Sequence, residues 1–210
     1  MTNLAELATP TAALWSERLI ARAIALQTFK RRYLVAVPNC TWTGHECDLL
    51  VVTDDLRIID VEVKISRADL RADAKKEKWW TRRWAFPFTG TTGGHALAGP
   101  PAPPMPNSHP PKVWKHYYAL PKEIWTPDLE ASLPSKESGI LLLHRDYESG
   151  YPKPVGHRPE IAVSCIRRAK PNRHAEKISA AAAVDIARLA SLRMWDSYQQ
   201  LEAATSKVVG

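Results

Sequence analysis

The sequence predicts an α/β protein in which a mixed central β-sheet is flanked by helices. Two observations lead to this prediction. Short apolar runs bounded by turn residues recur between residues 33 and 65, as expected for consecutive strands. Segments with helical spacing of apolar residues precede and follow those runs. Since 210 residues suit one domain with a sizeable core, we expect residues 1–210 to form a single domain.

The first helix is predicted from about residue 10 to residue 32, in the segment "TPTAALWSERLIARAIALQTFKRR". Thr9 is a suitable N-cap, and Pro10 suits the first helical position. On a helical wheel, apolar residues surround Glu17 at separations of three, four and seven. We therefore expect one carboxylate on the face that should be buried. The alternative is a helix carboxylate that pairs with Arg18 or Arg22, or that lies at the margin of the apolar stripe.

Three short strands are predicted next, at residues 33–38, 47–53 and 57–65. The turn segments "NCTWTGHE" and "DD" separate them. Such short connections indicate a meander within one sheet.

A second helix is predicted from about residue 66 to residue 82, because Ser66 and Asp69 form a capping-box pattern. Basic residues recur along it at near-helical spacing: Arg67, Arg71, Lys75, Lys78 and Arg82. This basic stripe either contacts phosphates or is a solvated helix face. The neighbouring Trp79, Trp80 and Trp84 either stack on unpaired bases or anchor the helix to the core.

Residues 86–111 hold eight of the 17 prolines and four of the nine glycines, which predicts an inserted loop or lid. Beyond this insertion we expect strands at 114–121, 139–146 and 160–168. An alanine-rich helix should close the chain at about 175–204.

The chain is basic, with 29 Lys and Arg against 22 Asp and Glu, which suits a polyanion such as nucleic acid. Cys40, Cys47 and Cys165 are too few for a disulfide framework, and no C-x-x-C pair indicates structural zinc. His45 beside Cys47 is treated as incidental. We expect a cytoplasmic protein that does not cross a membrane, because no signal peptide and no run of eighteen apolar residues is visible.

The segment "DVEVKISRADLRAD" carries the candidate site. Successive strand residues point to opposite sides, so Asp60, Glu62 and Lys64 should share one face of the third strand. Charges in such an apolar strand are costly unless they are paired or hold an ion. The alternative is an exposed edge strand that carries a surface ion pair.

Asp48 begins the second strand, and in a meander its side chain can converge with that of Glu62 at one sheet edge. Two adjacent carboxylates repel unless a cation lies between them, and oxygen ligands favour Mg²⁺ or Mn²⁺. Lys64 faces the same way and could orient a water or neutralise phosphate charge. Two carboxylates that hold a divalent cation, with a lysine beside them, are groups that metal-assisted phosphodiester hydrolysis uses.

The helix with Glu17, then "CDLLVV" with Asp48, then "VEVK", resembles the PD-(D/E)xK nuclease superfamily, which has a restriction-endonuclease-like core of order α-β-β-β-α-β. "VEVKISRADLRADAKK", "HYYALPKEI", "SGILLLHRD" and the alanine-rich C-terminal helix together resemble its MmcB-like DNA repair branch. The likeness runs over about residues 14–200, with 80–112 departing from it.

The resemblance implies that Asp48 and Glu62 ligate a divalent metal, with the Val63 carbonyl as a further ligand. It also implies that Lys64 positions the attacking water or stabilises the transition state, and that Glu17 supplies an outer carboxylate. Asp60 and Glu46 have no clear counterpart in the pattern.

The expected function is therefore a Mg²⁺- or Mn²⁺-dependent DNA endonuclease of repair or recombination type. A catalytically inactive nucleic-acid-binding module on the same fold is the alternative. An interaction protein with a basic surface is a third reading. The sequence leaves open the DNA structure recognised, the choice between DNA and RNA, and a possible homodimer.

Overall fold

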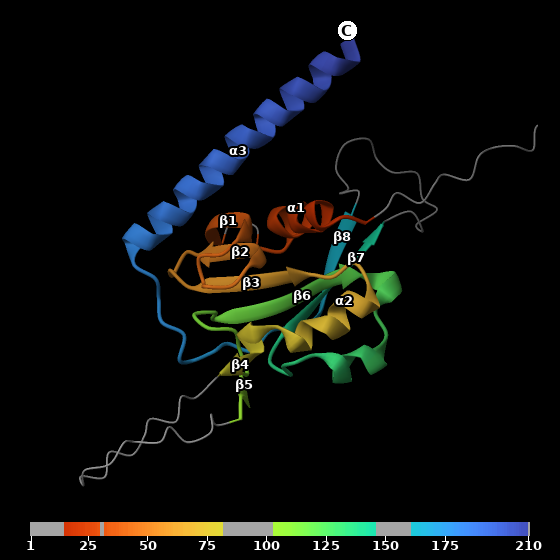
Figure 1. The fold of residues 1–210 in the computed structure, drawn as a ribbon, viewed down its shortest axis with the longest axis vertical. Coiled ribbons are helices and arrows are strands. Elements are labelled where there is room, and N and C mark those ends of the chain that lie inside the picture. Colours follow the sequence, from red (N-terminus) through yellow and green to blue (C-terminus); the bar gives the residue numbers. More distant parts are fainter. Residues whose placement is uncertain (1–14, 30–31, 82–102, 146–160, 210) are drawn as a thin grey trace, which may run out of the picture.

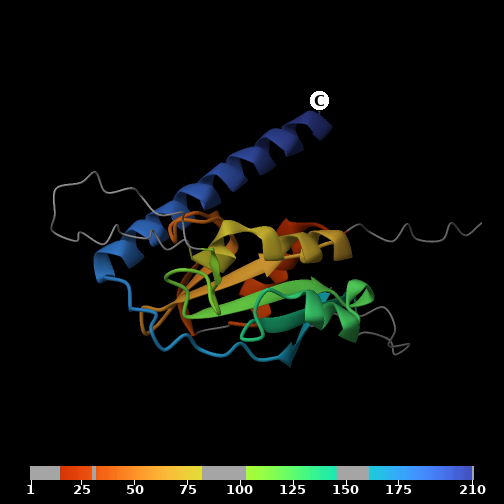
Figure 2. The ribbon, with the colours of Figure 1, turned by 60° about the horizontal axis from the view of Figure 1, so that its bottom comes forward.

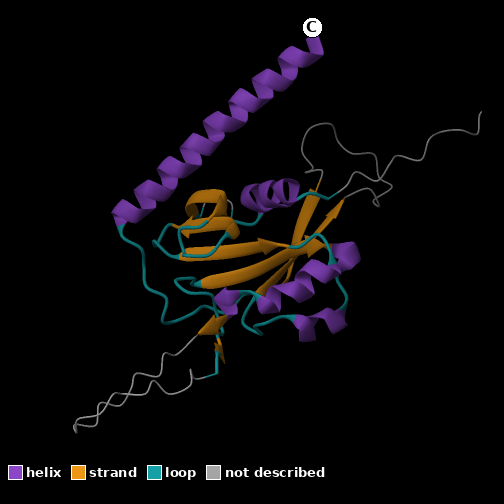
Figure 3. Cartoon of the chain, in the orientation of Figure 1, coloured by secondary structure: helices purple, strands orange, loops and turns teal. Residues whose placement is uncertain are grey.

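The computed structural model describes residues 15–29, 32–81, 103–145 and 161–209. Within these residues a six-stranded mixed sheet is flanked by helices, so the predicted α/β class is confirmed (Figures 1 and 3). Most of the predicted insertion at 86–111 lies outside the described residues.

The sheet has the strand order β1-β2-β3-β6-β7-β8, and all six strands match predicted ones within a few residues. A separate two-stranded ribbon pairs β4 (Trp80–Thr81) with β5 (Met105–Pro106). The strands of the main sheet are β1 (Tyr33–Cys40), β2 (Cys47–Thr53), β3 (Ile58–Val63), β6 (Lys115–Pro121), β7 (Gly139–Arg145) and β8 (Ile161–Arg167).

The strands β1, β2 and β3 form the predicted antiparallel meander. Leu49 pairs with Val61 and Leu50 with Asp60, so the first residues of β2 lie beside the last residues of β3. On its other edge β3 pairs in parallel with β6, which brings His116 opposite Asp60. The register therefore places Asp48 at the same end of the sheet as Glu62.

The helices α1 (Glu17–Gln27) and α2 (Arg67–Ala72) cover opposite faces of the sheet (Figure 2). Ile20 and Ile24 of α1 pack in one core cluster, with alternate strand residues such as Val61. Leu70 of α2 packs in another cluster on the other face. The charged residues of β3 alternate with Val61 and Val63, and so they face the α2 side.

The helix α1 begins at Glu17, later than predicted. Ser16 is its N-cap, and the Ser16 hydroxyl accepts a hydrogen bond from the Leu19 N–H at 3.3 Å. The predicted cap Thr9 and Pro10 lie outside the described residues.

The second predicted helix is wrong in its length, although its capping box is confirmed. Ser66 Oγ accepts from the Asp69 N–H at 3.1 Å, but α2 ends at Ala72. Two short 3₁₀ turns follow at Asp73–Lys75 and Glu77–Trp79. Lys76 between them has an extended backbone, with φ −66° and ψ 140°. With this break in the helix, Asp73 points into the interior. A continued α-helix would not direct the residues after Asp73 into the interior.

The C-terminal helix α3 (Ala180–Val209) starts five residues later than predicted and runs five residues further. The segment between β8 and α3 lies against the domain. Within it, the Ile178 N–H donates to the Leu56 carbonyl at 2.8 Å. Its first turns bury Ala183 and Ile186 against the sheet, and the rest projects away from the body (Figure 1). No helix in the described part of the chain is long and apolar enough to span a bilayer.

Replacing Gly139 by alanine should lower the free energy of unfolding by roughly 1–3 kcal/mol, because the added methyl group has no space. Gly139 pairs with Tyr117 in the parallel ladder, and a Cβ there would overlap the Tyr117 ring and lie 2.7 Å from the Ala169 nitrogen. Urea denaturation measures the change. An unchanged midpoint with an unchanged slope would show that the ring moves aside freely.

Candidate functional site

The three charged residues of the third predicted strand are buried, so the exposed-edge alternative is wrong. Asp60 and Glu62 have no exposed area, and Lys64 is 2% exposed. All three lie between the sheet and the segment that contains α2 and the 3₁₀ turns. A charged group at this depth needs partners, and the structure provides them.

The Glu62 carboxylate is bound by three lysines. Its Oε2 accepts from Lys64 Nζ at 3.1 Å and from Lys76 Nζ at 2.9 Å, and its Oε1 accepts from Lys78 Nζ. Burial and the nearby Asp60 raise its pKa, but Lys78 and Lys64 outweigh them and hold the pKa below its usual range. Glu62 is therefore ionised at neutral pH.

Asp73 binds two of the same lysines, and together with Glu62 and its lysines it forms a buried ion network. Its Oδ1 lies 3.0 Å from both Lys64 Nζ and Lys76 Nζ, and its Oδ2 accepts from Trp79 Nε1 at 3.0 Å and Tyr118 Oη at 2.5 Å. Burial opposes ionisation, but Lys64, Lys78 and the Tyr118 hydrogen bond lower the pKa of Asp73 well below its usual range. The network thus joins β3, the 3₁₀ turns and β6.

Asp48 is the one predicted site acid whose charge is poorly compensated. Its Oδ2 accepts from the Val63 N–H at 2.7 Å. Burial and the nearby charge of Glu62 raise its pKa to about 7, although the Val63 hydrogen bond and Lys64 act in the opposite direction. Glu17 raises it slightly further. An acid with such a pKa favours a cation beside it.

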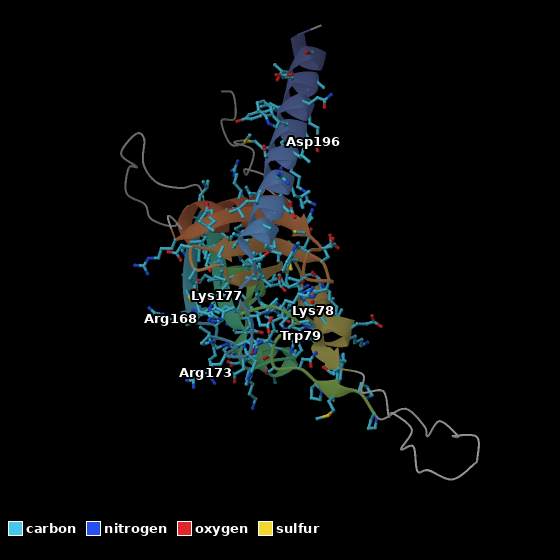
Figure 4. The ribbon with its side chains drawn as sticks, turned by 90° about the vertical axis from the view of Figure 1, so that its left-hand side faces the viewer. Lys78, Trp79, Arg168, Arg173, Lys177 and Asp196 are labelled. Carbon is cyan, nitrogen blue, oxygen red and sulfur yellow. The ribbon has the colours of Figure 1, made fainter. Side chains whose placement is uncertain are left out.

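Asp48 also lines a cavity of about 640 Å³. The cavity is bounded by α1, the ends of β1 and β2, and one side of α3. Charged residues of both signs line it: Glu17, Arg18, Arg22, Asp48, Arg193 and Asp196. Asp196 lies on the part of α3 above the sheet (Figure 4). The site is thus accessible from solvent, with arginines close to the acids.

Lys64 contacts Glu62 directly at 3.1 Å, and the charges of these two residues act in opposite directions on the pKa of Asp48, which Glu62 raises and Lys64 lowers. The Lys64 N–H donates to the Ala119 carbonyl of β6 at 2.9 Å. The carbonyl of Val63 belongs to the same trans peptide, so it points the opposite way, toward β2.

Glu17 also lines this cavity, in the position at the margin of the apolar stripe that the alternative prediction gave it. It is exposed at the first turn of α1, whereas the helical wheel placed it on the buried face. Helix α1 buries Ile20, Ala21 and Ile24, and Glu17 lies at the margin of that stripe, where it meets the cavity.

The basic stripe does not form one continuous surface. Lys78 is buried and bound by Glu62 and Asp60, so it does not lie on the exposed face with the others. Arg67 is exposed and donates to the Ile124 carbonyl at 2.9 Å. Arg71 and Lys75 are exposed, and Arg82 lies outside the described residues.

Trp79 anchors its segment to the core, which is the second of the two roles predicted for these tryptophans. It is 1% exposed, packs beside Lys78 and donates to Asp73 (Figure 4). Trp80 is 41% exposed, and Trp84 lies outside the described residues.

Sequence reasoning missed Asp73, Lys76, His116 and Tyr118. Asp73 forms a second acid-x-Lys match with Lys75, but it stands in a charged stretch with helical spacing, which is typical of a solvated helix face. The signal that could have found it is the pair of tryptophans directly after the charged run. Two bulky aromatics there indicate that this segment turns toward the core.

No protein-family model matches the chain, and a search of curated proteins finds no match. Among solved structures, a protein of unknown function from Silicibacter pomeroyi is similar, with a TM-score of 0.48 and 18% identity. The match covers 90% of this chain and 93% of that one. No functional conclusion is taken from it.

Proposed function

We propose that the chain is a divalent-metal-dependent DNA endonuclease of repair or recombination type. The observation that supports this most is Asp48, a carboxylate in an arginine-lined cavity whose pKa is raised to about 7 by burial and by Glu62. Carboxylates brought together in this way are stabilised by a cation that both can bind.

The donor set fits Mg²⁺ or Mn²⁺. Asp48, Glu62 and the carbonyl of Val63 are hard oxygen donors, which these ions prefer. When bound, the ion would supply Lewis-acid polarisation of a phosphate and a water of lowered pKa. Glu17, at the mouth of the cavity, would act on the ion through water, because it is exposed and belongs to another element.

Lys64 is held in one place by Glu62 at 3.1 Å and Asp73 at 3.0 Å. This fixes an ammonium group near enough to Asp48 to lower its pKa, and such a group could orient a water or bind a phosphate oxygen. Arg18, Arg22 and Arg193 line the same cavity and suit the flanking phosphates of a nucleic acid strand.

The surface elsewhere is also suited to a polyanion. The segment after β8 carries exposed basic residues on one side of the body, of which Arg168, Arg173 and Lys177 are labelled in Figure 4. A net charge of +7 also suits a polyanion such as nucleic acid. The homodimer and the cytoplasmic location stay predictions from the sequence.

One observation favours the second candidate, a nucleic-acid-binding module without cleavage. Glu62 is already bound by Lys64, Lys76 and Lys78, and a metal ligand must present at least one free lone pair. A metal ion would therefore have to use the remaining lone-pair site of Glu62 or displace one of these ammonium groups. Lys76 is the most mobile candidate, because its side chain is 46% exposed.

We expect the purified chain to cut at least one of duplex, single-stranded, flap or four-way-junction DNA in Mg²⁺ or Mn²⁺. EDTA should abolish cleavage, and Lys76→Ala should preserve or increase it, because that change frees one lone pair of Glu62. Labelled substrates resolved on denaturing gels measure both effects. A matched RNA strand tests the choice of nucleic acid.

Salt-sensitive DNA binding in EDTA, with no cutting in either metal by the wild type or by Lys76→Ala, would favour the binding module instead. Absence of both binding and cutting would contradict both candidates.

A further inference from the structure

A second cluster of ligand-type side chains lies where the β1–β2 turn meets β3. His45 Nε2 is 3.4 Å from Asp60 Oδ2 and 3.9 Å from Cys47 Sγ. The three ligand atoms lie within 4.8 Å of one another. They come from two strands and a turn, so the sequence spacing gave no sign of them, and His45 beside Cys47 was treated as incidental.

Buried polar atoms beside this cluster lack partners among the described residues. Asp60 Oδ1 and His116 Nε2 make no hydrogen bond, although neither residue has any exposed area. His116 donates to or accepts from Ser138 Oγ through Nδ1 at 2.9 Å, which aims its Nε2 at Asp60 Oδ2, 3.9 Å away. Such unpaired atoms are costly, and a bound ion with its water would satisfy them.

A cysteine nucleophile does not account for the cluster. In a catalytic relay, one ring nitrogen of the histidine faces the thiol and the other faces the acid. Here Nε2 of His45 faces both Cys47 and Asp60. The Cys47 sulfur and an Asp60 carboxylate oxygen instead both lie near the same His45 nitrogen, as expected when three ligand atoms surround one metal ion.

The spacing fits a tetrahedral ion. With bonds of about 2.0–2.3 Å, ligand atoms of a tetrahedral Zn²⁺ site lie roughly 3.3–3.6 Å apart. The Nε2–Oδ2 distance of 3.4 Å already fits, the Nε2–Sγ distance of 3.9 Å needs a small contraction, and Cys47 Sγ lies within 4.8 Å of the Asp60 carboxylate. One imidazole nitrogen, one sulfur and one carboxylate oxygen suit Zn²⁺, and they do not suit Mg²⁺.

The site is open on one side. Of the three ligands, His45 lines a cavity of about 560 Å³, together with Thr43, Gly44, Glu46 and the charged Lys76, Glu77 and Lys78, so solvent reaches the cluster at His45. Loss of the Cys47 proton to solvent would leave one thiolate and one carboxylate to neutralise a divalent ion. Lys78 lies 3.5 Å from Asp60 and also binds Glu62, which it shares with Lys64 and Lys76.

We propose that His45, Cys47 and Asp60 bind one Zn²⁺ ion, with solvent from the cavity as the fourth ligand. The ion joins the β1–β2 turn to β3. His116 is a positioning residue that holds the Asp60 carboxylate from behind. This site does not depend on the proposed nuclease activity, since it shares no ligand with Asp48 or Glu62.

The test is a titration of the full-length, chelator-treated protein with Co²⁺, followed by its sulfur-to-metal absorption band and by Zn²⁺ competition. We expect one equivalent of Co²⁺ to give the band, and Zn²⁺ but not excess Mg²⁺ to remove it. Cys47→Ser should lose the band, and His45→Ala should weaken binding roughly 100-fold or more. His45 lies in a turn and is partly exposed, so this second variant is expected to fold.

Three controls keep the result specific. Cys165→Ser changes an exposed cysteine of β8 and Cys40→Ser changes the buried partner of Cys47 in the β1–β2 ladder, and both should retain the band. Asp48→Asn should also retain it, which separates this site from the proposed nuclease centre. A wild type without the band, or a band that survives Cys47→Ser or disappears in Cys40→Ser, would overturn the proposal.

Discussion

Replacing Asp73 by alanine is expected to lower the free energy of unfolding by about 3–5 kcal/mol, a large part of the stability of a domain of this size. The change leaves Lys64 and Lys76 with one acidic partner fewer in a buried setting. It also removes the acceptor of Trp79 Nε1 and Tyr118 Oη. Removing one partner from a buried ion network costs more free energy than the intact ion pairs contribute on balance, because the remaining buried groups lose their partner.

Chemical denaturation of Asp73→Ala beside Asp69→Ala measures this effect. Asp69 faces the same Lys64 at 3.7 Å, but it is 41% exposed, so its loss should cost at most about 1 kcal/mol. Equal losses in the two variants would show that burial of the network does not matter for stability.

The pH dependence gives an independent check of Asp73. Its pKa in the folded protein is lowered from the ordinary 3.8, so its contribution is present above about pH 4 and is lost as the pH falls further. The wild type should therefore lose stability more steeply than Asp73→Ala on acidification below pH 4. Parallel curves for the two proteins would contradict the ion network.

Replacing Asp48 by asparagine should have opposite effects on stability and on activity. In the absence of metal at pH 8, the variant should be more stable than the wild type by roughly 3 kcal/mol, because the unfavourable charge is removed. The amide oxygen can still accept the Val63 N–H. DNA cleavage should fall by roughly 1,000-fold or more, because a neutral amide is a poor ligand for a divalent ion.

The sign of the pH effect follows from the raised pKa of Asp48. Its folded-state value of about 7 exceeds the ordinary 3.8, so wild-type stability is favoured at low pH and declines as the pH rises from about 4 through 7. The advantage of Asp48→Asn should therefore grow over that range and level off above it. Thermal melts from pH 5 to pH 8.5 in EDTA measure this.

Asp54→Asn is the matched control, because Asp54 is an exposed acid in the turn between β2 and β3. It should leave stability and cleavage unchanged. A less stable Asp48→Asn, or one that retains cleavage, would argue that Asp48 is a structural acid and would weaken the nuclease proposal.

The strands were predictable because their signal is local. Apolar runs between turn residues gave β2 as Cys47–Thr53 without error and the other main-sheet strands within a few residues. The alternation of side chains along β3 was enough to place Asp60, Glu62 and Lys64 on one face. Local hydrogen bonding also fixed the capping box at Ser66.

The end of the second helix was not predictable in the same way. The sequence from Asp73 to Trp79 is compatible with a continued helix, and its lysines have helical spacing. The backbone leaves the helix at Lys76 because Trp79 and Lys78 gain more from burial against Asp73 and Glu62 than a further helical turn provides. That gain depends on strands that are distant in the sequence.

The sequence by itself determined the α/β class, the meander and the shared face of the three charged residues, because strand pairing and side-chain alternation depend on neighbouring residues. Only the tertiary structure decided which charges are paired. It gave Glu62 three lysine partners, left Asp48 with a raised pKa, and brought His45 and Cys47 to Asp60. The strength of an electrostatic interaction depends on burial and on distances in space, and neither quantity is written in the order of residues.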